Sequence, residues 1–500
     1  MSVQKKAVII GAGVGGITTA LFLARNGFSV EVFEKNVSPG GRCGQIIHEA
    51  HRFDLGATIL LMPSLYRQVF TALGMDMDTE LETTSLEPVY KLFFGDGTDF
   101  AFTRNAKQMQ MQLEAWEAGS HAAYKRYINE GYDFFHRSMD GLLNRNYRHI
   151  FQFINLPSLL LLFRLKVWIK HTDYIKRFFK DKRLQKAFTF QNIYVGQNPY
   201  SQPAFFSMLP GAEIAEGALF PKAGMHRLVE KLIENATNSG VKFHYKSAVS
   251  KIIVNGKKTE GIQLETGELI SADLVIANAD LPYVYDALLP DRKASKALKR
   301  KEYSCSAIVF HWGLDKLYPQ LEHHSIFLNE PYKEGMDRIF DDKSVSENPS
   351  FYVHAPVRTD KTAAPENHET LSVIVPVGHI DPKHEQDWQT LKYRTREAVI
   401  SRLKQAGLTD IENHIKFELT FTPKTFESYC NVTNGSVFGS LSHTIFQMGW
   451  FRPHNQHGKY KNLYFVGGST HPGNGIPLVL LGAKLTSERI MRNIKTTPNP

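Results

Sequence analysis

The stretch Ala7-Val8-Ile9-Ile10-Gly11-Ala12-Gly13-Val14-Gly15-Gly16 sets a short apolar run directly before a glycine-rich turn. The β-branched run predicts a buried parallel strand, and the pattern from the turn to Ala24 predicts a helix. A second β-rich run, Ser29-Val30-Glu31-Val32-Phe33, ends on Glu34. Strand, glycine turn, helix, second strand and terminal acid, in this order, indicate a βαβ unit that binds a dinucleotide.

Each part of this unit has a defined chemical use. Glycines permit the tight turn and let the backbone approach a pyrophosphate, whose charge is favourable at the helix N-terminus. We therefore predict that the turn holds the pyrophosphate and that Glu34 accepts hydrogen bonds from a ribose. A glycine-rich turn that binds nothing is the alternative. The residues assigned to the turn are Gly11, Ala12, Gly13, Gly15 and Gly16.

Positive charge is concentrated in one segment of the chain. The 500 residues have a net charge of +9, and the segment from Arg145 to Lys186, with eleven Lys/Arg and two Asp/Glu, carries +9 by itself. Apolar residues such as Phe163 and Trp168 lie among these charges, but Pro157 and the basic residues interrupt them before the ~20 apolar residues that span a bilayer. We predict that this segment contacts an anionic membrane surface. A pair of helices with a solvated basic face is the alternative, and no nucleic-acid motif accompanies the charge.

The cysteines and the start of the chain bear on its location. Cys43, Cys305 and Cys430 show neither a metal-binding spacing nor a disulfide framework, which favours a reducing compartment. The first predicted strand begins at residue 7, so we expect no signal peptide. We predict a peripheral membrane protein on the cytoplasmic side.

Two further turns suit the same cofactor. Pro39-Gly40-Gly41-Arg42 predicts a tight turn beside the dinucleotide, from which the Arg42 guanidinium can reach the pyrophosphate in bidentate fashion. Phe53-Asp54-Leu55-Gly56-Ala57-Thr58 has an apolar entry and a glycine. Such a turn commonly approaches a flavin ring, and a simple hairpin is the alternative.

With these motifs, the sequence resembles the bacterial and fungal carotenoid desaturases, especially the phytoene and dehydrosqualene desaturases. The resemblance extends over nearly the whole chain, and the most specific part is the C-terminal glycine-rich run. The matching motifs are Gly11-Ala12-Gly13-x-x-Gly16, Glu34-Lys35, Gly40-Gly41-Arg42, Phe53-Asp54-x-Gly56, Met62-Pro63-Ser64-Leu65-Tyr66, Tyr194-Val195-Gly196, Tyr303-Ser304-Cys305-Ser306-Ala307, Ala364-Pro365-Glu366 and the run from Leu463 to Pro477.

The resemblance implies an FAD-dependent enzyme that introduces carbon–carbon double bonds into a long isoprenoid. It also implies an α/β fold (α+β overall). A Rossmann-type FAD-binding domain of the two-dinucleotide-binding flavoprotein type is expected to be interleaved with a substrate domain built on a mixed sheet with helices. We assign residues 1–75, 220–302 and 441–500 to the FAD-binding domain. Residues 76–219 and 303–440 form the substrate domain, and the first of these two segments also provides the membrane contact.

By resemblance, further residues are expected around FAD. The backbone near Ala248 and Val249 would bracket the adenine. The glycine turn before the last helix would face the flavin with free backbone N–H groups. The remaining residues assigned to FAD are Lys35, Gly41, Gly56, Ala57, Thr58, Asn278, Gly467, Gly468, Ser469, Gly475, Ile476, Pro477 and Leu478.

Desaturation removes a hydride and a proton from adjacent carbons. Because a flavin accepts the hydride, the reaction needs neither a catalytic triad nor a metal, and the sequence shows no metal-ligand cluster. We interpret His323-His324 and His454/His457 as structural or surface residues. His471, beside the glycine turn, is the one candidate for acid–base work, and a hydrogen bond that orders its loop is the alternative.

The sequence leaves several functions open. A desaturase of a hydroxylated carotenoid end and an oxidase of terminal methyl groups share these motifs. A protein of another class, a prenyl-binding escort without flavin, is disfavoured because it would not need Gly40-Gly41-Arg42. The predicted partners are a long apolar polyisoprenoid, the membrane surface and an electron acceptor such as oxygen or a quinone, with no nucleic acid.

Overall fold

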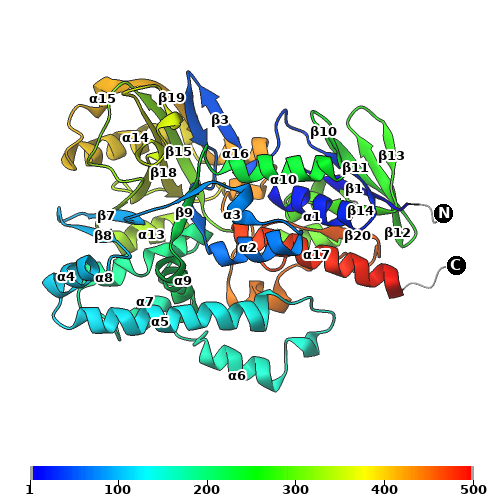
Figure 1. The fold of residues 1–500 in the computed structure, drawn as a ribbon, viewed down its shortest axis with the longest axis horizontal. Helices are drawn as coiled ribbons and strands as arrows, with labels where there is room; N and C mark the ends of the chain where they lie inside the picture. Colours follow the sequence, from blue (N-terminus) through cyan, green and yellow to red (C-terminus); the bar gives the residue numbers. More distant parts are fainter. Residues whose placement is uncertain (1–3, 290, 497–500) are drawn as a thin grey trace.

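The computed structural model describes residues 4–289 and 291–496 (Figure 1). Residues 1–3, 290 and 497–500, which fall in segments predicted to belong to the FAD-binding domain, lie outside the described residues.

A five-stranded parallel sheet gathers strands that are far apart in sequence. Strand β1 lies at its centre, where Ile10 is in register with Phe33 on one side and with Ala277 on the other. The predicted strand is nearly inaccessible, with Val8 and Ile9 at 0% exposure, so its β-branched side chains form core. The strand order is β10 (Lys242–His244), β2 (Ser29–Phe33), β1 (Lys6–Ile10), β14 (Leu274–Ala277) and β20 (Leu463–Phe465).

Helices cover this sheet, on the right of Figure 1. The predicted helix after the glycine turn is α1 (Val14–Arg25), which packs against α10 (His226–Asn238) and α17 (Ile476–Thr496). Helix α2 (Pro63–Ala72) packs on α17. The last helix begins at Ile476, directly after the glycine turn, and Pro477 belongs to its first turn.

A seven-stranded mixed sheet forms the second layer, at the upper left of Figure 1. Its neighbouring strands are antiparallel except β16 and β7, which run parallel. The order is β19 (Ile415–Phe421), β15 (Ser306–Leu314), β18 (Glu369–Val377), β17 (Phe351–His354), β16 (His324–Leu328), β7 (Tyr90–Phe94) and β8 (Asp99–Phe102). The α/β fold with a parallel sheet and a mixed sheet is therefore confirmed.

Three small sheets complete the strands. One hairpin turns at Asn255-Gly256, and the run that includes Phe53 and Asp54 forms another before its turn. The strands are β11 (Val249–Asn255), β12 (Lys258–Leu264) and β13 (Leu269–Ser271); β3 (Gln45–His48) and β4 (His51–Asp54); and β5 (Leu60–Leu61), β9 (Ala218–Pro221) and β6 (Thr83–Ser85).

A helical layer lies at the bottom of Figure 1, where α6 (Leu156–Arg164) projects from the body of the molecule. The long helix α5 (Ser120–Ser138) crosses α9 (Met208–Glu216) at two glycines. A side chain at Gly131 would collide with the Ser207 carbonyl, and one at Gly211 would meet Gly131, so the two backbones touch.

The other helices connect these layers. They are α3 (Met77–Glu80), α4 (Ala106–Trp116), α7 (His171–Ile175), α8 (Lys182–Ala187), α11 (Leu281–Tyr283), α12 (Arg292–Leu298), α13 (Tyr332–Phe340), α14 (Trp388–Gln405), α15 (Ile411–His414) and α16 (Pro423–Cys430). A π-helical turn, η2 (Met139–Leu143), extends α5.

Candidate active site

A cavity of about 660 Å³ has walls from two parts of the chain. The glycine turns after β1 and β20 supply one part of the wall. Aromatic and aliphatic side chains, among them Phe190, Phe206 and Met336, supply the other. A site for a polar dinucleotide is therefore continuous with an apolar chamber.

All but two of the residues predicted to bind the cofactor line this cavity. They are Gly11, Gly13, Gly15, Glu34, Lys35, Gly41, Arg42, Gly56, Ala57, Thr58, Ala248, Val249, Asn278, Gly467, Gly468, Ser469, Gly475, Ile476, Pro477 and Leu478. The exceptions, Ala12 and Gly16, support the turn instead: the Ala12 N–H donates to Glu34 Oε2 at 2.8 Å, and a side chain at Gly16 would collide with the Gly11 carbonyl.

The first glycine turn is packed around Asn278, which follows β14. Its Nδ2 donates to the Gly11 carbonyl at 3.3 Å. A Cβ at Gly13 would lie 2.8 Å from Asn278 Nδ2, and one at Gly15 would lie 2.7 Å from its Oδ1. Helix α1 begins here with Gly13 as its N-cap and no capping side chain, so its first N–H groups suit an anion.

Glu34 and Lys35 are held by protein partners at the end of β2. The two Glu34 carboxylate oxygens accept from the N–H groups of Ala12 and Asn36 at 2.8 and 2.9 Å. The Lys35 ammonium donates to the Ser428 carbonyl and to Asn431 Oδ1, and burial lowers its pKa. The Lys35 side chain thus joins the turn after β2 to the end of α16.

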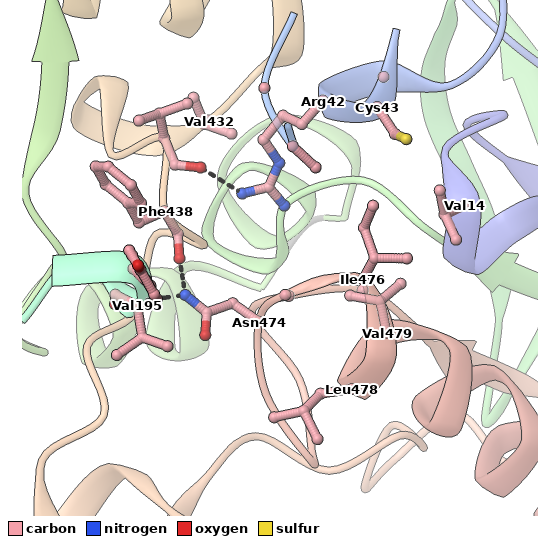
Figure 2. A pocket seen from close by; sticks show the side chains of 18 of the residues that line it. Val14, Arg42, Cys43, Val195, Val432, Phe438, Asn474, Ile476, Leu478 and Val479 are labelled. Carbon is pink, nitrogen blue, oxygen red and sulfur yellow. Dashed lines mark hydrogen bonds between the residues drawn. The ribbon is translucent and has the colours of Figure 1, made fainter. Parts of the chain in front are cut away.

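Arg42 and Asn474 approach the same backbone segment from opposite sides (Figure 2). Arg42 Nη1 donates to the Val437 carbonyl at 2.9 Å, and its Nη2 lies beside Gly468. Asn474 Nδ2 donates to the carbonyls of Phe438 and Val195. Ile476, Leu478 and Val479 face the cavity from the start of α17. Asn474 was not predicted, because its partners are distant in sequence.

Arg452 organises the wall that carries the C-terminal glycines. It is 1% exposed and donates to the carbonyls of Leu441, Ser442, Gln447, Gly468 and Thr470 at 2.5–3.4 Å. Burial lowers the pKa of its guanidinium to about 9. No sequence motif marked this residue, since its acceptors are main-chain atoms.

A buried carboxyl lies behind the apolar wall. Glu213 is 2% exposed, and the hydroxyl of Tyr90 donates to its Oε2 at 2.9 Å. The Tyr194 hydroxyl also lies near this carboxyl, and both tyrosines line the cavity. Burial raises the pKa of Glu213 to about 8, so the group is protonated at neutral pH.

The histidines occupy several different environments. His471 is not among the residues that line the cavity; its Nε2 bonds to the Arg145 carbonyl at 2.9 Å, and burial lowers its pKa to about 3. This arrangement favours the loop-ordering alternative. His324 and His443 do line the cavity, and His323 and His324 meet His354 instead of standing apart from other ligands.

Comparison with known proteins identifies the family. Residues 14–491 match the model described as flavin containing amine oxidoreductase. The chain is 40% identical over 491 residues to the zeta-carotene-forming phytoene desaturase of Myxococcus xanthus, covering 97% of this chain and 94% of that one. It is 31% identical to the 4,4'-diapophytoene desaturase (4,4'-diaponeurosporene-forming) of Staphylococcus aureus (strain Newman), covering 98% and 99%.

The chain belongs to the carotenoid desaturase family of flavin-containing amine oxidoreductases. A solved structure of a putrescine oxidase variant has the same fold, with a TM-score of 0.64, 12% identity and coverage of 98% of this chain and 99% of that one. The cofactor of this desaturase is FAD. The uncapped α1 N-terminus and the glycine-lined wall fit its pyrophosphate, and the bound flavin would supply the hydride acceptor.

Replacing Gly13 tests the placement of the pyrophosphate. Gly13→Val should weaken FAD binding by about tenfold or more, because a branched side chain occupies the anion-binding turn. The nearest protein atom to its Cβ is the Asn278 amide, so we expect most of the protein to remain folded. Flavin content and circular dichroism measure the two effects.

Gly27→Val is the matched control, since nothing lies within 4 Å of a Cβ there and the position is outside the cavity wall. Because Gly27 has a positive φ, which valine disfavours, we expect Gly27→Val to lose some stability. Its flavin content should nevertheless match that of the parent. Full flavin occupancy in Gly13→Val would contradict the placement.

The buried carboxyl makes stability depend on pH. The folded-state pKa of Glu213, about 8, lies above its ordinary value of 4.5, so the native state keeps a proton that the unfolded state loses. The free energy of unfolding therefore falls as pH rises from about 4.5 to 8. Glu213→Gln removes this contribution, and its Tm relative to the parent should rise between pH 5 and pH 8.

Thermal unfolding at several pH values measures the effect. Glu216→Gln on the same helix is the control, because its carboxylate accepts from Ser64 near the surface. A Tm difference for Glu213→Gln that is constant across this pH range would show that the carboxyl does not titrate as described.

Proposed function

We propose that this protein is an FAD-dependent desaturase that introduces carbon–carbon double bonds into an acyclic carotenoid precursor. The observation that carries the proposal is the continuity of the dinucleotide site with an apolar chamber. The names of the relatives, which desaturate phytoene and diapophytoene, support the choice of a long hydrocarbon substrate.

The chamber has the properties that such a substrate needs. Phe190, Phe205, Phe206 and Met208 line it, so a hydrocarbon can replace water along the wall. An apolar wall orients two adjacent substrate carbons and displaces water from the reacting bond once the substrate fills the chamber. Thr58, which bonds to Tyr352 at 2.8 Å, sets a pair of hydroxyl groups in this otherwise apolar surface.

Substrate length and end groups distinguish the candidate reactions. We expect the protein, co-expressed with enzymes that make thirty-carbon or forty-carbon precursors in a pigment-free host, to yield a desaturated acyclic product from at least one of them. Chromatography with mass detection would identify the substrate and count the double bonds. Because the relatives include desaturases of both precursor lengths, both arms are needed.

The same experiment separates the alternatives. Products that carry new oxygen atoms would indicate a terminal-methyl oxidase, and activity only on a hydroxylated carotenoid would indicate an end-group desaturase. Unchanged precursors in cells that contain soluble, flavin-loaded protein would overturn the proposal. The Gly13→Val variant is the matched inactive control.

We also propose that the protein attaches peripherally to the cytoplasmic face of a membrane through α6 and the chain around it. In α6, Leu156, Leu159, Leu160 and Phe163 are 52–69% exposed, an unusual arrangement for large apolar side chains. Phe446, 72% exposed, adds to the apolar surface contributed by the nearby loop. Among the described residues, none of the helices has the length and hydropathy required to cross a bilayer.

Exposed basic residues beside α6 support this mode of attachment. Arg164 and Lys170 are exposed and have no ion-pair partner in the described part of the chain. Four other basic residues of the segment are ion-paired within the described residues: Lys166 with Glu130, Lys176 with Asp173, Arg183 with Asp181 and Lys186 with Glu330. Free cations beside exposed leucine and phenylalanine match an interface of anionic headgroups and acyl chains.

The membrane surface also lies near one part of the cavity wall. Met139 and Leu143 of η2 line the cavity, and Leu161 of α6 packs against Gly141 between them. A hydrocarbon that leaves the bilayer at α6 would therefore meet the apolar chamber through η2. Delivery from the membrane to the cofactor needs no passage through water along this route.

Charge reversal tests the membrane contact. Arg164→Glu with Lys170→Glu should weaken binding to vesicles of anionic lipid by at least about tenfold, because each cation near the surface contributes about 1 kcal/mol. Vesicle sedimentation measures the loss. The control is Lys257→Glu with Lys258→Glu at the exposed β11–β12 turn, and equal loss in both variants would contradict a role for α6.

A further inference from the structure

Three histidines meet where β16 begins and β17 ends. His324 and His354 are opposite each other in the antiparallel register of these strands, and His323 precedes His324. One ring nitrogen of each lies within 4.8 Å of the corresponding nitrogen of the other two. The three side chains belong to residues that are 1–4% exposed, so bulk water does not separate them.

The outer nitrogens of two rings are held by hydroxyl groups. His323 Nδ1 bonds to Thr359 Oγ1 at 2.7 Å, and His324 Nδ1 bonds to the Tyr352 hydroxyl at 2.6 Å. These bonds orient both rings and leave their Nε2 atoms for other partners. Tyr352 also bonds to Thr58, so the cluster is connected to the cavity wall.

The inner nitrogens are incompletely satisfied. His323 Nε2 and His354 Nε2 are 3.2 Å apart, while His324 Nε2 and His354 Nδ1 have no hydrogen-bond partner among the described residues. A buried polar atom without a partner is unfavourable, because it has lost its hydrogen bonds to water. The cluster therefore has ligand capacity beyond its one internal hydrogen bond, in particular at His324 Nε2.

The three rings lie in buried surroundings. Arg52 and Arg358 lie nearby, but each is paired with a carboxylate, Asp360 and Glu369 respectively. The charge of these two guanidiniums is therefore neutralised, and an imidazole can ligate a metal through either ring nitrogen.

We propose that His323, His324 and His354 form a site for one divalent transition-metal ion, best matched by zinc. Imidazole is a preferred zinc ligand, and tetrahedral zinc with Zn–N distances of about 2.0–2.1 Å sets its ligands about 3.3 Å apart. The observed separation of 3.2 Å between two of the nitrogens is close to this value. Three protein ligands leave a fourth coordination position for water.

A metal here would have a structural consequence that is independent of the substrate. It would fasten the start of β16 to the end of β17 and fix Tyr352 through its bond to His324. Tyr352 in turn holds Thr58 at the cavity wall. None of the three histidines is among the residues assigned to FAD. The metal site would therefore be a second binding site, separate from that of the flavin.

Zinc analysis tests the site in the FAD-loaded protein. After chelation and dialysis against zinc, the parent should retain one zinc ion per chain and show a higher Tm than the chelated protein. His354→Gln should lose both effects. His311→Gln is the control, since His311 is buried in the same seven-stranded sheet and bonds to Ser372 outside the cluster.

Cobalt substitution gives a second readout that does not depend on activity. The parent and His311→Gln, loaded with Co²⁺, should show the strong visible bands of tetrahedral coordination, and His323→Gln and His354→Gln should not. If either variant fails to fold, the metal content and the cobalt spectrum of the parent decide whether the site binds a metal ion. Less than a tenth of an ion per parent chain, or undiminished binding in the His323→Gln/His354→Gln double variant, would overturn the proposal.

Discussion

Close packing of the Asn278 side-chain amide against the first glycine turn is the constraint on which the cofactor site depends. Its amide donates to Gly11, and side chains at Gly13 or Gly15 would come within 2.8 Å of its polar atoms. The turn after β1 and the end of β14 can therefore touch only because the turn lacks side chains. The same contact leaves the uncapped N-terminus of α1 open toward the cavity.

The part of the cavity wall that carries the C-terminal glycines depends on buried polar side chains as well as on glycines. Arg452 gathers carbonyls from Leu441 to Thr470, so a loop with little regular structure is held by charge-assisted hydrogen bonds. Asn474 joins the glycine turn to Phe438 and Val195. These contacts bring the start of α17 to the cavity, where its free N–H groups can face a flavin.

The apolar chamber, together with α6 and its exposed apolar side chains, gives this cofactor site its proposed use. Polar cofactor contacts occupy one part of the wall, and aromatic side chains occupy the rest. Exposed leucines on α6 would be unfavourable in water but are suited to lipid, and η2 connects them to the chamber. The proposed cofactor site uses the polar part of this surface, and the proposed substrate path and membrane contact use the apolar part.

The sequence was most informative where structure is determined locally. The β-branched run 7–10 and the glycines after it predict β1, the turn and the start of α1, because each residue type limits its own backbone. Most residues assigned to FAD by resemblance line one cavity. Arg452, Glu213 and the pairing of His323 with His354 could not be predicted, since their partners come together only when distant segments fold.

Anaerobic reaction of the FAD-loaded protein with an acyclic carotenoid precursor in vesicles is the most direct test of the central claim. If the dinucleotide site and the apolar chamber form one active site, loss of the oxidised-flavin absorbance should accompany one new double bond per flavin. A desaturated product formed in excess over flavin while the flavin remains oxidised would contradict the account. So would complete absence of flavin reduction in protein that desaturates the same precursor in air.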